Sequence, residues 1–227
     1  MRQIQELEAL IFDYPELSHL PARYRNASGA THRPCPTAQS QFLVDLAYTY
    51  LDPDKAAASQ FEPYSISLLT DYLKRTHADY TCRILPQIEA GLEALASRYD
   101  DSVLSGAALP LFRAFAADLQ AHIALEEKLF FPYAVQTEAL ASGGETVSEL
   151  ISYSTSAFSD HHPNHDADVD KLDMLLQGLE AKYNGDMAFR ILRKRIALLM
   201  SDLRIHCLIE DDVLAEKVRV AERMVRN

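Results

Sequence analysis

Residues 122–132 of the chain read HIALEEKLFFP. His122 and Glu126 stand four positions apart, and residues with this spacing lie on the same face of an α-helix. Apolar side chains continue that face in both directions, at Leu111, Phe115, Leu119, Leu129 and Tyr133. A carboxylate on an apolar face is costly to bury unless it is paired or binds a metal ion. This stretch therefore predicts a helix with a buried His/Glu pair that needs a partner.

A second pair with the same spacing occurs near the end of the chain, where residues 206–211 read HCLIED. His206 and Glu210 continue another apolar stripe, formed by Leu192, Ile196, Leu199, Leu203 and Val213. An exposed i,i+4 pair is the alternative for both sets. Their position on apolar stripes argues against that alternative.

Four long stretches show the helical spacing of apolar residues. The first follows Pro63 and ends near Tyr99, the second begins at Pro110, the third follows Pro163, and the fourth starts near Asp186. Turn signals separate them at Asp100-Asp101, Ser142-Gly143-Gly144 and Asn184-Gly185. Pro86 is expected to kink the first helix. The pattern predicts an all-α protein, with an up-down-up-down four-helix bundle over residues 61–227.

Residues 1–60 are expected to form an N-terminal helical extension, with short helices over 3–11 and 38–51. Three roles remain open for this extension. It covers one end of the bundle, binds a partner, or forms a homodimer.

The spacing of four histidines places them at one level of the bundle. In an antiparallel helix pair, two residues are level when they are equidistant from the turn. The midpoint between His77 and His122 is 99.5, that between His122 and His165 is 143.5, and that between His165 and His206 is 185.5. Each midpoint coincides with one of the three turns, so the four imidazoles are expected to meet.

Four imidazoles and two carboxylates are about twice what one ion needs when positions are left open. Two metal ions, each with two histidines and both sharing the two glutamates, would use the whole set. Mixed nitrogen and oxygen ligands without thiolate favour iron, or less strongly manganese, over structural zinc. The order His-x-x-x-Glu also differs from the Glu-x-x-His motif of ferritin-like di-iron bundles.

Four motifs together resemble the hemerythrin-like HHE superfamily, and within it the di-iron "repair of iron centers" (RIC) proteins. The motifs are THADYTCRILPQIE (76–89), HIALEEKLFFP (122–132), NHDADVDKL (164–172) and HCLIED (206–211). The resemblance implies a non-haem di-iron centre in which two glutamates bridge the irons. The implied ligands are His77, His122, Glu126, His165, His206 and Glu210.

Several residues near these motifs have open or secondary roles. His161 is an additional candidate ligand, because it stands four residues before His165. Tyr80 either hydrogen-bonds to a ligand or serves as a core aromatic residue. Glu127 is expected to face solvent, since it lies 100° around the helix from Glu126. Cys82 and Cys207 are expected to be small buried residues.

The composition excludes some classes of partner. The 227 residues carry a formal net charge of −11, which disfavours nucleic acid as a partner. The chain contains no apolar run long enough for a membrane span and no secretory signal. Three widely spaced cysteines imply no disulfide framework, so a cytoplasmic location is expected.

The resemblance to RIC proteins implies a stress protein that binds NO or O₂, or that supplies iron to damaged iron–sulfur proteins. Open positions on iron would bind such small diatomic ligands. The alternative is a hemerythrin-like module that binds or senses O₂ or NO without turnover. The sequence assigns no catalytic residue to either function.

Overall fold

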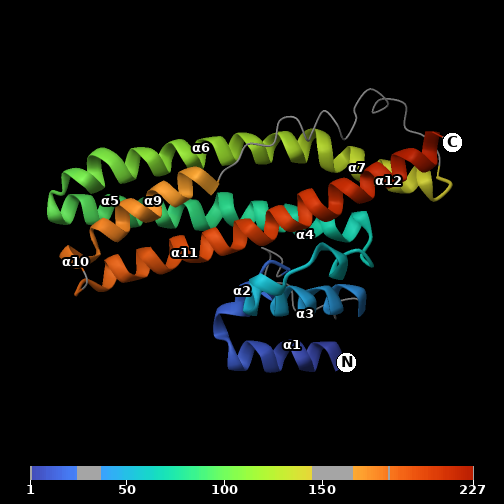
Figure 1. The fold of residues 1–227 in the computed structure, drawn as a ribbon, viewed down its shortest axis with the longest axis horizontal. Coiled ribbons are helices and arrows are strands. Elements are labelled where there is room, and N and C mark those ends of the chain that lie inside the picture. Colours follow the sequence, from blue (N-terminus) through green and yellow to red (C-terminus); the bar gives the residue numbers. More distant parts are fainter. Residues whose placement is uncertain (1, 25–36, 145–165, 184, 227) are drawn as a thin grey trace. The chain divides into compact units, whose positions relative to one another are not determined.

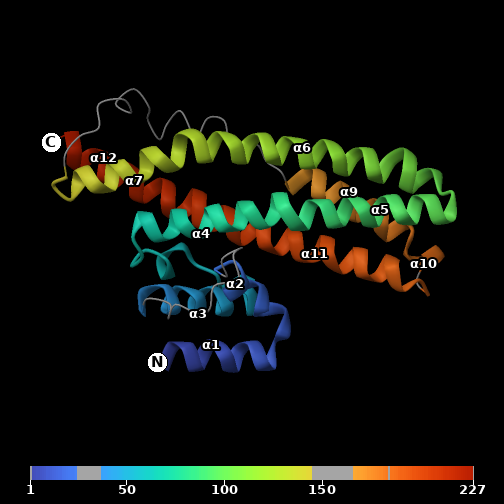
Figure 2. The same cartoon turned by 180° about the vertical axis from the view of Figure 1, so that it is seen from behind.

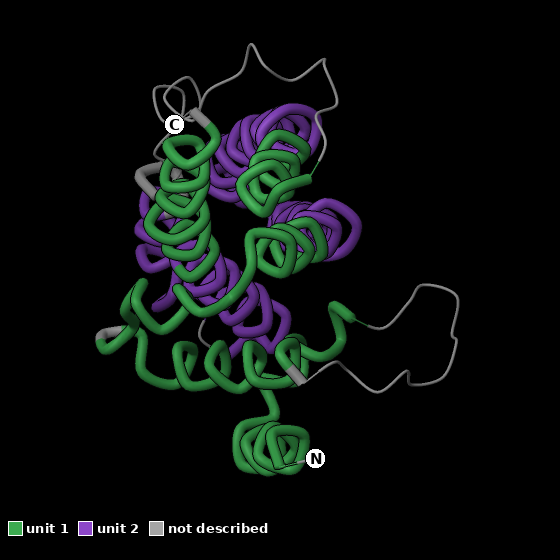
Figure 3. Tube along the Cα trace, turned by 90° about the vertical axis from the view of Figure 1, so that its right-hand side faces the viewer, with its two compact units in different colours: residues 1–76, 131–155, 205–227 green, residues 77–130, 156–204 purple. Residues whose placement is uncertain are grey.

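A computed structural model describes residues 2–24, 37–144, 166–183 and 185–226. None of the helices in these ranges is long and apolar enough to cross a membrane. The chain divides into two compact units (Figure 3). Unit 1 comprises residues 1–76, 131–155 and 205–227, and unit 2 comprises residues 77–130 and 156–204. Each unit is therefore assembled from segments that are distant in the sequence.

Unit 2 contains a bundle of four long helices. They are α5 (Leu85–Tyr99), α6 (Leu109–Leu125), α9 (Asp166–Gly178) and α11 (Met187–Cys207, in this unit as far as residue 204). Helices α5 and α6 run side by side, and α6 also packs against α9 (Figures 1 and 2). All four helices contribute to one hydrophobic core, with Leu92, Phe112, Leu176 and Ile196 among its members.

The turn between α5 and α6 is built from two aspartates. Asp100 adopts a left-handed conformation (φ 46°) that ends α5. The Oδ1 atom of Asp101 accepts hydrogen bonds from the amides of Val103 (2.8 Å) and Leu104 (3.1 Å), and thereby caps the next helix. These contacts confirm the turn predicted at Asp100-Asp101.

The connection from α9 to α11 runs through the short helix α10 (Glu180–Tyr183). Asp186 Oδ1 accepts the amide hydrogen of Phe189 at 2.9 Å and caps α11, which confirms the predicted start of this helix near Asp186. Helix α5 packs closely against α11 at Gly91. A Cβ atom built at this position would lie only 3.2 Å from Leu192 Cδ1.

Among the described residues, four π-helical turns interrupt the α-helical geometry of the long helices. They are η4 (Tyr80–Ile84), η5 (Leu104–Ala108), η6 (Glu126–Phe130) and η7 (Leu208–Leu214). Pro86, Pro110 and Pro132 each follow one of the first three turns by two residues. A proline ring clashes with the carbonyl four residues earlier, and the wider π turn relieves that clash. Prolines therefore stand inside continuous helices here.

The predicted start of the second helix at Pro110 is wrong. The chain is already helical at Ser102 and stays helical through η5 into α6. Pro110 is compatible with helical geometry at that position because a π turn, and not the end of a helix, precedes it. Pro86 likewise lies in a helix that continues to Tyr99.

Unit 1 contains the N-terminal helices and the other ends of the long helices. Its elements include α1 (Arg2–Asp13), η1 (Pro15–Ser18), α2 (His19–Ala22), α3 (Thr37–Leu51), η2 (Pro53–Lys55), η3 (Ala58–Gln60), α4 (Ile66–Asp79, in this unit as far as residue 76), α7 (Phe131–Ala141) and α12 (Ala215–Arg226). Helix α1 lies along α3, and α7 along α12 (Figures 1 and 2). The predicted helices over 3–11 and 38–51 are thus confirmed.

An aromatic cluster links α3 to α4 within unit 1. The ring of Phe42 makes edge-to-face contacts with Tyr64, Tyr72 and Phe61, at centroid distances of 5.0, 5.2 and 5.8 Å. Phe42, Phe61 and Tyr72 are fully buried. The N-terminal residues therefore share a core with the first half of α4.

The ends of α4 and α7 are fixed by specific contacts. The carboxylate of Glu138 on α7 accepts the amide hydrogens of Ile66 (2.7 Å) and Ser67 (2.9 Å), which caps the start of α4. Gly143 has a positive φ of 86° at the end of α7, and a Cβ atom at Gly144 would lie 2.9 Å from the carbonyl oxygen of Ala139. Glycine is thus required at this turn, as predicted.

The all-α class is confirmed, with long helices packed as a bundle and additional N-terminal helices. The division into residues 1–60 and 61–227 stays a prediction.

Candidate metal centre

Glu126 lies at the centre of the candidate site in unit 2. It occupies the first position of η6, directly after α6, and its exposed fraction is 0%. Its Oε1 atom lies 2.5 Å from Nε2 of His122, and its Oε2 atom lies 3.3 Å from Nε2 of His77. The two carboxylate oxygens therefore face two different imidazoles.

His77 reaches Glu126 from α4, at the position where this helix enters unit 2. The imidazole is almost completely buried, with an exposed fraction of 1%. The hydroxyl of Thr81, in η4, donates to the carbonyl oxygen of His77 at 2.9 Å and fixes the backbone of His77 near the end of α4. His77 and His122 are level, as the turn midpoint at 99.5 predicts, because both contact one carboxylate.

Glu127 is exposed, as expected, and also contacts a candidate ligand. Its side chain is 42% exposed, yet Oε1 lies 3.2 Å from Nδ1 of His77. The imidazole of His77 thus lies between two consecutive glutamates, with Nε2 toward Glu126 and Nδ1 toward Glu127. The prediction that Glu127 faces solvent is confirmed, and the contact with His77 is an additional feature that the sequence did not indicate.

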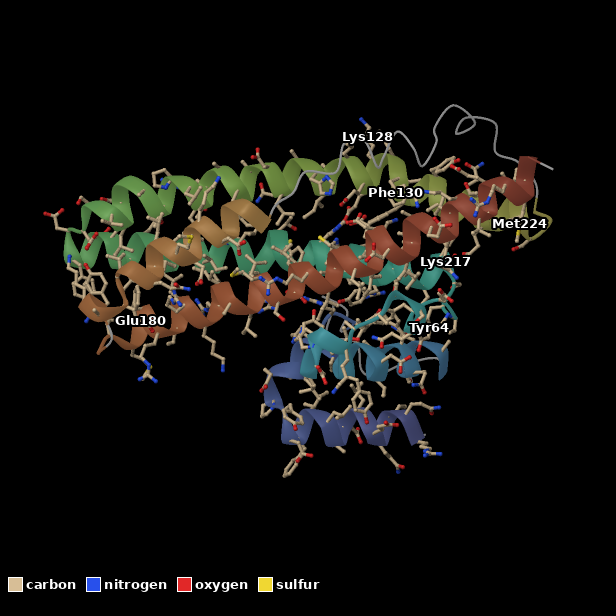
Figure 4. All side chains as sticks on the ribbon, in the orientation of Figure 1. Tyr64, Lys128, Phe130, Glu180, Lys217 and Met224 are labelled. Carbon is tan, nitrogen blue, oxygen red and sulfur yellow. The ribbon has the colours of Figure 1, made fainter. Side chains whose placement is uncertain are left out.

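The π turn explains why two consecutive glutamates reach one ring. Successive residues of an α-helix are rotated by 100°, so in an ideal α-helix Glu127 would point away from the face of Glu126. A π turn contains more residues per turn, so the directions of Glu126 and Glu127 diverge less. Other residues of the turn follow the ordinary pattern, since Lys128 is exposed and extends outward while Phe130 is buried (Figure 4). A single wide turn leaves no periodic signal in the sequence.

His206 and Glu210 form the corresponding pair in unit 1. His206 lies in the last turn of α11 and Glu210 in η7, and His206 Nε2 is 3.2 Å from Glu210 Oε2. Both residues are buried. Every predicted member of this apolar stripe is buried as well: Leu192, Ile196, Leu199, Leu203 and Val213. The interpretation as an exposed i,i+4 pair is therefore wrong here, and also for His122 and Glu126, whose side chains are 9% and 0% exposed.

Two of the predicted ligands, His165 and His161, lie outside the residues that the structure describes. Five of the six favoured ligands are described, three of them in unit 2 and two in unit 1. Their assignment to metal ions stays a prediction at this point.

Nearby residues play other parts. Tyr80 is fully buried and belongs to the hydrophobic core of unit 2. The prediction that both cysteines of this region are buried is wrong, because Cys82 is exposed and Cys207 is partly exposed. The atoms that could bind a metal ion around Glu126 and Glu210 are the imidazole nitrogens of the neighbouring histidines and the carboxylate oxygens of the two glutamates.

This donor set fits a metal ion. In the part of the chain that is described, Glu126 is shared by two groups of candidate metal ligands, and within unit 2 one group contains His77 and the other His122. Neutral imidazole nitrogen and carboxylate oxygen are ligands that iron and manganese accept. A buried carboxylate is expensive without a proton, a cation or a metal beside it, and a metal between each oxygen and its imidazole would remove that cost.

Comparison with protein families agrees with this chemistry. The profile of the hemerythrin HHE cation-binding domain matches residues 68–218, about two thirds of the chain. Neither the curated proteins nor the solved structures gave a significant match. The matched segment includes all six favoured ligands, and the chain therefore belongs to the hemerythrin HHE cation-binding domain family.

Proposed function

We propose that this protein holds a non-haem di-iron centre whose ligands are His77, His122, Glu126, His165, His206 and Glu210. The observation that carries the proposal is the geometry of Glu126. One of its oxygens faces His77 and the other faces His122, as a carboxylate that bridges two metal ions requires. The family match supports the proposal, since all six residues fall within it.

The geometry in unit 2 supports one histidine on each side of the proposed bridge. His77 would bind the iron on the Oε2 side of Glu126, and His122 the iron on the Oε1 side. By the equivalent spacing of residues 206–211, Glu210 would supply the second bridge and His206 a further nitrogen. His165 would complete two histidines for each metal.

Burial determines what these residues do for the chemistry. Glu126 and His77 are almost inaccessible to solvent, so their charges and lone pairs act in surroundings of low dielectric constant. When bound, the iron pair supplies redox chemistry and open positions for a small diatomic ligand. The protein residues hold the metals, balance part of their charge and exclude bulk water.

For the biological role we propose the repair of iron–sulfur proteins under nitrosative or oxidative stress, with binding of NO or O₂ or donation of iron. The resemblance of four motifs to RIC proteins supports this role. Six ligands shared between two metals would also leave the iron labile enough to be transferred.

Metal analysis of the purified protein tests the centre. Anaerobic reconstitution with Fe(II) should give about two irons per chain, and oxidation should give ferric charge-transfer absorption. The double variant Glu126→Ala/Glu210→Ala should lose two-iron binding, whereas Glu180→Ala, an exposed glutamate of α10 labelled in Figure 4, should keep it. No iron in the wild type, or two irons in the double variant, would refute the proposed centre.

A second assay tests the role. The iron-loaded protein is mixed with an NO-damaged iron–sulfur enzyme, and both the recovered activity and the iron left on the protein are measured. Recovery with loss of iron supports donation, and recovery without loss supports NO removal. If two irons bind and no activity returns, the repair role is wrong and the alternative of a binding or sensing module gains support.

A further inference from the structure

We propose that Glu127 is a positioning residue, which orients His77 toward one of the two metals and tunes its basicity. This inference rests on the di-iron centre proposed above, because it assigns a task to a residue beside a ligand. Glu127 is not itself among the six proposed ligands.

The first step of the argument is the geometry of the His77 ring. Its Nε2 atom faces Glu126 Oε2 at 3.3 Å, and its Nδ1 atom faces Glu127 Oε1 at 3.2 Å. A neutral imidazole has one N–H and one lone pair. With Nδ1–H donating to Glu127, the lone pair of Nε2 points to the side of Glu126 where the metal is placed.

The second step is the chemistry of this contact. A carboxylate that accepts the other N–H of a metal-binding histidine fixes the tautomer and the ring orientation, and makes the ligand nitrogen more basic. The backbone of His77 is already held by the Thr81 hydroxyl. Glu127 fixes the remaining freedom, namely rotation of the imidazole about its own side-chain bonds.

The third step separates this task from a role in folding. Pairs that involve a side chain exposed to 42% contribute little to the stability of the fold. The π turn η6 replaces the regular i→i+4 hydrogen bonds of the α-helix with i→i+5 bonds, and it contains Glu127. It begins at Glu126, the proposed bridging residue. Glu127 can therefore be replaced with little effect on folding and a measurable effect on metal binding.

The experiment is a titration of the anaerobic apoprotein with Fe(II) in competition with a chelator, which gives two stepwise binding constants. Glu127→Ala should weaken one step by roughly 10–100-fold, the range typical for loss of such a partner, and leave the other step nearly unchanged. Glu127→Gln keeps an oxygen acceptor without the charge, so it should weaken the same step severalfold. Glu180→Ala is the matched control and should bind as the wild type does.

Mössbauer spectra of the ⁵⁷Fe-loaded proteins give a second readout. In Glu127→Ala, the signal of one iron should change while the signal of the other is retained. A merely structural role would disturb both irons. Unchanged constants in Glu127→Ala, or equal weakening of both steps, would overturn the inference.

The outcomes also distinguish this inference from the proposed function. A wild type that binds no iron overturns both, whereas a two-iron wild type that fails the repair assay overturns only the repair role. If Glu127→Ala loses helical content in circular dichroism, the inference is tested with the folded Glu127→Gln variant instead. Selective weakening of one step then supports the inference, and wild-type constants in Glu127→Gln overturn it.

Discussion

At the scale of single residues, the buried carboxylate of Glu126 is the most demanding group in unit 2. A fully buried charge needs partners, and His77 and His122 provide them from two different helices. In the metal-free protein an imidazole N–H can occupy the position beside each carboxylate oxygen, and in the proposed loaded centre a metal ion would take that position. If the proposed centre is correct, the same three side chains serve folding in the metal-free protein and metal binding in the loaded one.

This exchange predicts the behaviour of Glu126→Gln. The amide oxygen can still accept a hydrogen bond from an imidazole, so the free energy of unfolding of the apoprotein should change by less than about 1 kcal/mol. A neutral amide is a poor bridging ligand, and the iron content should fall from two to one or fewer per chain. Urea denaturation of the apoprotein and iron analysis of the loaded protein measure the two effects. Retention of both irons would contradict the bridging role.

At this scale the sequence indicates Glu126 but not the contact of its neighbour Glu127 with His77. Glu126 stands out because a charge interrupts an apolar stripe. Glu127 stands on the polar side of an ideal helix, and only the π turn brings it to His77. A signal was present in the sequence, since Pro132 follows two positions after that turn, as Pro86 and Pro110 follow theirs. A proline inside an apolar helical stripe is therefore compatible with a π turn before it, although η7 has no such proline.

At the scale of elements, the ends of helices are fixed by carboxylates. Asp101 accepts hydrogen bonds from Lys182 Nζ (2.6 Å) and the Tyr183 hydroxyl (2.5 Å), besides the amides of Leu104 and Val103. The bonds from Lys182, Tyr183 and Leu104 hold the pKa of Asp101 well below its usual range. One side chain thereby joins the start of the second long helix to α10.

The lowered pKa predicts a pH dependence of stability. A carboxylate with a depressed pKa in the folded state stabilises the protein above its unfolded pKa of about 3.9, and this contribution is lost as the pH falls through the folded value. The wild type should therefore lose stability below about pH 4–5, and Asp101→Asn should show a smaller loss over the same window. At pH 7 the variant should be less stable by about 1–2 kcal/mol, because the amide oxygen keeps the cap but the charged acceptor of the bonds from Lys182 and Tyr183 is lost.

Urea denaturation from pH 7 to pH 2 checks this prediction. Asp118→Asn, an exposed aspartate on α6, is the matched control and should follow the wild type. Equal pH dependence in wild type and Asp101→Asn would show that this carboxylate does not carry the effect.

At the scale of elements, the sequence predicts helices best where apolar residues recur at helical spacing over many turns. Each apolar residue of the predicted stripe from Leu192 to Val213 is buried on α11 or η7. The start of the second helix was wrong because Pro110 is a favourable first-turn residue, and a proline signal alone does not distinguish a helix start from a π turn.

At the scale of the whole molecule, the two units differ in how they build their cores. Unit 2 is filled by residues of four long helices, whereas unit 1 includes a cluster in which N-terminal aromatic residues contact α4. The sequence predicted short helices in this N-terminal region but not their packing. Phe42 and Tyr72 are thirty positions apart, and no local pattern connects them.

The aromatic cluster makes a test of unit 1 possible without touching the proposed ligands. Phe42→Ala removes a fully buried ring that contacts three others, so we expect a loss of about 3–5 kcal/mol in the free energy of unfolding of unit 1. Phe12→Ala, on the same N-terminal segment, removes a ring that is 86% exposed and should change stability by less than about 0.5 kcal/mol. Circular dichroism and tyrosine fluorescence can follow unfolding, since the chain contains no tryptophan.

The shape of the unfolding curve then shows how far the units depend on each other. If unit 1 unfolds in a transition of its own, Phe42→Ala should shift that transition alone; if both units unfold together, it should shift the single transition of the whole chain. In either case the iron content should stay at two per chain under native conditions, because Phe42 is not among the proposed ligands. A Phe42→Ala variant as stable as Phe12→Ala would show that the aromatic cluster does not hold unit 1 together.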